Sequence, residues 1–225
     1  MGFKYPIPAV RHRGSGFRFS ASPLVSIVQS VASPSFAAKT SYTLSLTGVK
    51  STSGLLVVAD VGSGDVASVT APGYTPTKLY ASGTAYGSDD LELWYLKGGA
   101  GGSVVVTVDN STDTASAGIL LEAYSNQSRS PSVQSNDGGT TGAGETWSSL
   151  TDTPTSSGCT VFYAFHPDSG CNSGGLPTSP WVASQYGLSY IGTAYQSNSP
   201  KTGQSTSYTQ FSSAPYATIG IVLAP

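Results

Sequence analysis

Short runs in which apolar and polar residues alternate recur from Ser41 onward, separated by clusters of turn-forming residues. The runs at 41–46, 89–96 and 103–108 each place their apolar side chains on one face of an extended chain. Residues 54–60 are almost continuously apolar, which predicts a central strand. Many short strands at this spacing are typical of an all-β sandwich or barrel.

The rest of the chain continues the β pattern. Further strands are expected near 117–124, 159–165, 187–195, 206–211 and 217–223. Only 23–33 and 115–123 could be interpreted as helices, and β-branched side chains argue against the first.

Two regions follow from this pattern. Residues 1–40 form an extended basic arm, to about residue 22, and a transition segment with one candidate strand. Residues 41–225 form the predicted β-sandwich body. Within the body, the polar stretch 126–158 is expected to be a long excursion around one short strand, because loops of this length are usually functional or mobile.

Charge is distributed unevenly along the chain. The first fifty residues hold six of the ten basic side chains and no acidic ones, so they carry +6 while the remainder carries −8. An arm of this kind on a weakly charged body suits an assembly protein that binds an acidic neighbour, rather than an enzyme. The arm residues expected to contact that partner are Phe3, Lys4, Arg11, Arg13, Phe17, Arg18 and Phe19.

Composition argues against several other classes of protein. Charged residues make up only 10% of the chain, and the body lacks the dense basic surface of a nucleic-acid reader. The N-terminus has no apolar segment typical of a secretory signal, and the longest apolar run, 55–59, is too short to cross a bilayer. We therefore expect a protein that is soluble when made, with no nucleic-acid or membrane partner.

Two short motifs have plainer interpretations than the chemistry they resemble. Residues 62–67 fit the dinucleotide pattern G-x-G-x-x-A, but the sequence that follows cannot begin the required helix, so a hairpin turn is expected. Residues 109–113 have the spacing of calcium ligands without the glycine and glutamate of an EF-hand. A turn between two strands is expected there.

No catalytic residue, metal or cofactor is expected. Asp89, Asp90 and Glu92 could in principle form a carboxylate pair for glycoside cleavage, but Asp90 and Glu92 lie opposite the apolar face and are expected to be solvated. His12 and His166 have no motif partner, and no nucleophile elbow surrounds any serine.

Cys159 and Cys171 are the only cysteines. They could form a disulfide closing a short loop, which would stabilise the fold by roughly 3 kcal/mol. They could also be free thiols, as in a reducing cytoplasm, or join His166 in an incomplete zinc set.

Aromatic residues gather near the C-terminal loops. Trp181, Tyr186, Tyr190 and Tyr195 are candidates for contacts between subunits, for stacking on a glycan, or for ordinary packing.

The order of several segments resembles a jelly-roll-like β-sandwich domain of tailed-phage virion proteins. The chain departs from that pattern at Tyr74, where tryptophan is commoner, and in the 126–158 stretch. The segments that carry the resemblance are 54–58, the Pro-Gly-aromatic turn in 69–75, 91–97, 103–108, 117–125 and 217–225.

This resemblance implies a bacteriophage structural protein located in the virion, and it supplies no catalytic residues. The leading interpretation is a homo-oligomeric capsid decoration (cement) protein, with the arm bound to the major capsid protein or another virion protein. The alternatives are a tail or fibre module that binds a receptor or host surface glycan, and a tail or neck accessory protein.

Overall fold

The computed structural model describes residues 24–33, 37–83, 90–170, 175–186 and 191–225. These ranges contain no α-helix, and every strand pairing is antiparallel. The strands are β1 (Val25–Ala32), β2 (Ala37–Val49), β3 (Ser53–Val61), β4 (Val66–Thr70), β5 (Tyr74–Ala81), β6 (Asp90–Gly98), β7 (Gly102–Ser125), β8 (Ser132–Ser148), β9 (Thr160–Pro167), β10 (Val182–Tyr186), β11 (Ile191–Ser197) and β12 (Ser207–Ala224).

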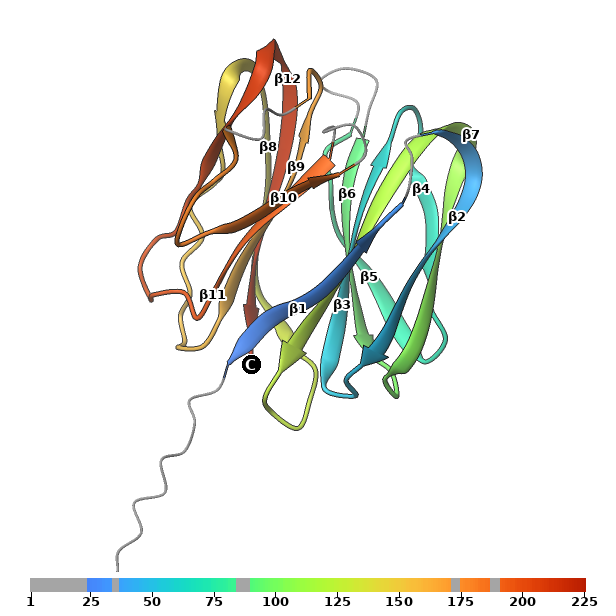
Figure 1. Ribbon diagram of the computed structural model, residues 1–225, viewed down its shortest axis with the longest axis vertical. Helices are drawn as coiled ribbons and strands as arrows, with labels where there is room; N and C mark the ends of the chain where they lie inside the picture. The colour runs from blue at the N-terminus through green and yellow to red at the C-terminus, as the bar shows by residue number, and fades with distance from the viewer. Residues whose placement is uncertain (1–23, 34–36, 84–89, 171–174, 187–190) are drawn as a thin grey trace, which may run out of the picture.

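Two sheets pack face to face, so the predicted all-β antiparallel sandwich is confirmed (Figure 1). The first sheet has the order β1-β7-β3-β6-β5, with β2 and β4 also paired to β7. The second has the order β10-β11-β9-β12-β8. Residues 25–125 build the first sheet and residues 132–224 build the second, so each sheet is one continuous part of the sequence.

The main core lies between the two sheets. The predicted apolar face of β6, with Leu91 and Leu93, meets Leu56 and Val58 of β3 on this side. Ile219 and its neighbours on β12 close the layer from the second sheet. Alternation along each strand therefore directs one set of side chains inward, as the sequence pattern predicts.

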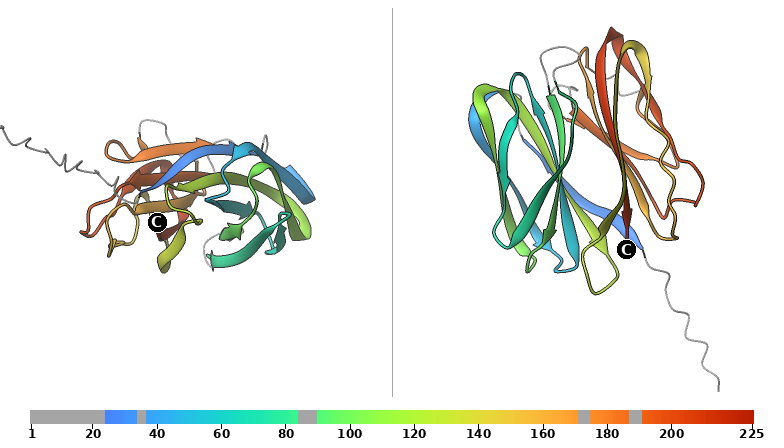
Figure 2. Two further views of the ribbon diagram at one scale, coloured as in Figure 1. Left: turned by 90° about the horizontal axis from the view of Figure 1, so that it is seen from below. Right: turned by 180° about the vertical axis from the view of Figure 1, so that it is seen from behind.

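A second core forms inside the first sheet, because this sheet folds over onto itself (Figure 2). Residues 102–110 of β7 pair with β2 and β4, whereas residues 116–125 pair with β1 and β3. Val104 and Val106 from the first half pack in the same cluster as Leu55 and Val57 of β3. All nine residues of β3 are buried, which confirms that it is a central strand.

The expected turn at 109–113 is wrong. β7 runs without interruption through these residues. In the pairing with β2, Lys39 lies opposite Thr114 and Ser41 lies opposite Asp109, so β7 has four residues, 110–113, where β2 has one, and they form an irregular bulge. The bulge occurs where β7 changes neighbours, and bulges of this kind bend a strand.

The expected turn at 62–67 is confirmed, but the hairpin is wrong. β3 ends at Val61 and β4 begins at Val66, yet β4 pairs with β7 and not with β3. The turn therefore carries the chain from one half of the folded first sheet to the other. Gly64 has a φ of +94°, a conformation that residues with a Cβ rarely adopt.

The polar stretch 126–158 contains a much longer strand than expected. β8 pairs with β12 along nearly its whole length, and Trp147 near its end is 1% exposed. β8 is rich in Gly, Ser and Thr, so it has no apolar alternation by which the sequence could predict it. Its backbone pairing with β12 defines the strand. The body also extends before residue 41, because β1 pairs with β7 and β2 begins at Ala37.

Candidate functional site

The chain enters the sandwich at one end, beside the C-terminus (Figure 1). The backbone N–H of Leu24 donates to Asn126 Oδ1 at 2.9 Å, and the N–H of Asn126 donates to the Leu24 carbonyl at 3.2 Å. The N–H of Val25 donates to the Gly158 carbonyl at 2.7 Å. We call this region, residues 24–25, 126–131, 155–158 and 225, the entry end.

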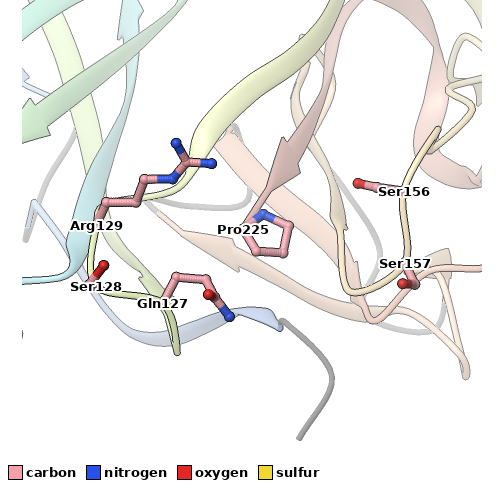
Figure 3. Close-up of a pocket in the computed structure, with 6 residues that line it drawn as sticks. All are labelled: Gln127, Ser128, Arg129, Ser156, Ser157 and Pro225. Atoms are coloured by element: carbon pink, nitrogen blue, oxygen red, sulfur yellow. The ribbon is translucent and has the colours of Figure 1, made fainter. Parts of the chain in front are cut away.

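A polar pocket of about 510 Å³ opens at the entry end (Figure 3). Hydroxyl and amide groups line it together with one exposed guanidinium, that of Arg129. Among the described residues Arg129 takes part in neither of the two ion pairs. The lining residues are Gln127, Ser128, Arg129, Ser156, Ser157 and Pro225.

Hydrogen bonds to the core hold the loops around this pocket. Ser130 Oγ donates to the Ser53 carbonyl at 2.8 Å, and the Tyr95 hydroxyl donates to the Pro131 carbonyl. Thr52 Oγ1 donates to the Ser125 carbonyl at 2.9 Å. Polar groups on loops that are held to the core in this way are suited to binding a partner in a fixed geometry.

The pocket is built from the two ends of the stretch that the sequence marks as an excursion. Residues 127–129 precede β8, and residues 156–157 follow the return of the chain. Its guanidinium and hydroxyl groups fit an anionic or polyhydroxyl group.

The predicted arm contacts, Phe3, Lys4, Arg11, Arg13, Phe17, Arg18 and Phe19, lie outside the described residues. What is described is the point at which the arm joins the body, next to the pocket.

Cys159 is a buried free thiol immediately before β9. Its Sγ lies 3.2 Å from Ser156 Oγ and donates to the Ser156 carbonyl at 3.3 Å. Cys171 lies outside the described residues, so its pairing stays a prediction.

The aromatic candidates do not share one described platform. Trp181 is half-buried and packs on Tyr163, with ring centroids 5.5 Å apart. Tyr195 packs against the core between the sheets. Tyr190, and the side chain of Tyr186, lie outside the described residues.

The expectation that Asp90 and Glu92 are solvated is wrong, because both are 0% exposed. Their face of β6 is covered by the folded-over half of the sheet, which sequence alternation alone does not reveal. Glu92 accepts a hydrogen bond from Lys78 Nζ at 2.8 Å and one from Trp94 Nε1 at 2.7 Å. Burial raises the pKa of both carboxyls, and Lys78 opposes the rise at Glu92.

His166 does have an acidic partner. Its Nδ1 lies 2.9 Å from Asp60 Oδ2, and the two residues are 4% and 0% exposed. The only signal in the sequence is a carboxylate that ends the apolar run of β3, and nothing local connects it to a histidine 106 positions away.

The described residues include no helix of the length and hydrophobicity that a membrane span needs. Comparisons with protein-family models, with curated proteins and with solved structures find no match to this chain.

Proposed function

We propose that the chain is a non-enzymatic virion structural protein of a tailed bacteriophage, most simply a capsid decoration protein anchored through residues 1–22. One observation carries the proposal furthest: the arm joins the body at the entry end, beside the pocket that contains Arg129. The cations of the arm and of the pocket can therefore act on the same neighbouring protein.

The physical basis is coupled ordering of the arm. An extended segment loses conformational entropy when it docks, and this cost must be offset by charge attraction and by buried apolar area. The arm supplies both, with Arg11, Arg13 and Arg18 for acidic patches and Phe3, Phe17 and Phe19 for apolar clefts. A homo-oligomer would add avidity without requiring a strong single site.

Sedimentation of purified protein with particles that lack it tests the proposal. Removing residues 1–22 should leave a folded body that no longer binds. Replacing Arg11, Arg13 and Arg18 by alanine should weaken binding most at low salt, and the difference from the wild type should shrink as salt rises, because salt screens the attraction that these cations supply. Lys97→Ala removes an exposed cation from the body and serves as the matched control. Full occupancy of particles by the truncated protein would contradict the proposal.

A second candidate is a tail or fibre module that binds host surface glycan. The hydroxyl-lined pocket favours it, as do the aromatic residues near β10. Saccharide binding on a glycan array that is lost in Tyr190→Ala would support it. Because Trp181 packs on Tyr163, Trp181→Ala must be checked for thermal stability before any lost binding is interpreted.

A tail or neck accessory protein would use the same arm at another position on the particle. Binding to isolated tails, and not to isolated capsids, would favour that assignment over decoration.

A further inference from the structure

Three carboxylates from two separate segments converge near the bend of the first sheet. Asp65 belongs to the turn between β3 and β4, and Asp90 and Glu92 lie at the start of β6. One carboxylate oxygen from each lies within 4.8 Å of the other two. Asp65 is exposed, so the cluster reaches solvent on one side while its other two members are buried.

The two carboxylate oxygens of Asp90 differ in their hydrogen bonding. Asp90 Oδ1 accepts hydrogen bonds from the Gly83 N–H at 2.6 Å and from Ser82 Oγ at 3.1 Å. Asp90 Oδ2, in contrast, is buried and has no hydrogen-bond partner among the residues that the structure describes. A buried carboxylate oxygen without a donor is costly unless a proton or a cation satisfies it.

Glu92 is nearly but not fully satisfied. Its oxygens accept from Lys78 Nζ, from the Val66 N–H at 3.0 Å and from Trp94 Nε1. A carboxylate offers about four lone-pair positions, so roughly one remains. Lys78 contributes one positive charge against three carboxylates, and it contacts only Glu92 among them.

We propose that Asp65, Asp90 and Glu92 bind a calcium ion, with water completing its coordination on the side of Asp65. An all-oxygen set is what hard divalent cations prefer. Two oxygens bound to one Ca²⁺ lie at most about 4.6–5.2 Å apart, whereas two bound to Mg²⁺ lie at most about 4.0–4.2 Å apart. The three oxygens lie within 4.8 Å of one another, so one Ca²⁺ ion can contact all of them.

The site differs from the calcium-like spacing at 109–113. Asp109 there accepts a hydrogen bond from Ser68 Oγ at 2.7 Å, and Asn110 Nδ2 donates to the Lys39 carbonyl and to Ser116 Oγ. In the proposed site the ion joins the β3–β4 turn to β6 and so crosses between layers. With three protein ligands, the dissociation constant should be on the order of 0.1–1 mM.

Thermal unfolding of the full chain, treated with chelator and then titrated with calcium chloride, tests this site. At about ten times the dissociation constant the wild-type melting temperature should rise by roughly 3–6 °C. Asp65→Asn should lose most of this shift, and calorimetry should give one ion per chain. Asp113→Asn is the matched control, because it removes an exposed carboxylate from the neighbouring bulge and should respond as the wild type does.

Four results would overturn the proposal: no response of the wild type, an undiminished response of Asp65→Asn, an equal loss in Asp113→Asn, or an equal response to magnesium. Asp90→Asn gives a second test, because it keeps an oxygen for Gly83 and Ser82 but removes the buried charge. If the variant folds and binds calcium as the wild type does, the charge of Asp90 takes no part in binding and the proposed three-carboxylate site is rejected.

Discussion

Asp60 on β3 and His166 on β9 connect the two sheets from inside the core, with Oδ2 of the aspartate 2.9 Å from Nδ1 of the histidine. Each residue lies on the face of its strand whose apolar side chains fill the core between the sheets. The pair is therefore a polar contact placed within an apolar interface.

Removing one member of this pair should destabilise the protein strongly. Asp60→Ala leaves His166 buried without its acidic partner, and breaking a buried pair from one side costs about 3–5 kcal/mol in the free energy of unfolding. Urea denaturation of Asp60→Ala, His166→Ala and the double variant measures the coupling between them. Additive losses would show that the two side chains do not stabilise each other.

Tyr95 should require a glycine at position 54. A Cβ placed at Gly54 would lie 2.5 Å from a ring carbon of Tyr95, which is too close for two nonbonded carbon atoms. Gly54→Ala should therefore cost about 1–3 kcal/mol by overpacking. Thermal unfolding checks this, with Gly48→Ser as a comparison for backbone strain alone, because nothing lies within 4 Å of that position. Unchanged stability of Gly54→Ala would contradict the role of the ring.

Asp90 should contribute more to the stability of the protein at acidic pH, where its carboxyl is neutral, than at neutral pH, where it is charged. Burial raises its folded-state pKa above the ordinary value of 3.8. The unfolded chain therefore releases this proton first as pH rises, and the contribution of Asp90 to stability falls between pH 3.8 and the higher folded pKa. In chelator, Asp90→Asn should raise stability at neutral pH by about 1 kcal/mol.

The advantage of Asp90→Asn should shrink as pH falls toward 3.8, where the wild-type carboxyl becomes neutral. Urea denaturation of both proteins at several pH values measures the difference. A difference that is independent of pH would show that the charge of Asp90 is not what destabilises the folded state.

Cys159 should be unreactive in the folded protein. Its Sγ is buried and hydrogen-bonded to Ser156, so an alkylating reagent should modify it only after unfolding. Mass spectrometry of native and denatured samples without reductant checks this. A mass lower by two hydrogens, with no alkylation in denaturant, would instead indicate the disulfide with Cys171.

Much of the strand pattern could be predicted from the sequence. The alternation at 41–46, 89–96 and 103–108 identifies the inward faces correctly, because each strand has at least one face in an apolar core. β8 was hidden because its residues are mostly small and polar, and its pairing with β12 leaves no periodic signature.

The candidate sites were less accessible to sequence reasoning. Residues 127–129 and 156–157 stood out only as parts of a long polar stretch, and nothing local indicated that β8 brings the two ends together. The sequence identifies Asp90 and Glu92 as candidate carboxylates. Their burial, however, depends on one half of the first sheet, with β2, β4 and the start of β7, folding over β3 and β6.

By itself, the sequence determined the all-β class, the inward-facing positions of most strands and the polarity between a basic arm and an acidic body. These properties depend on neighbouring residues and on period, which a linear chain displays directly. Only the tertiary structure decided which polar groups are buried and which meet, such as Asp60 with His166 or Asp65 with Asp90. Burial of a strand's second face and contacts between distant segments depend on how layers stack, and that is a property of the folded chain as a whole.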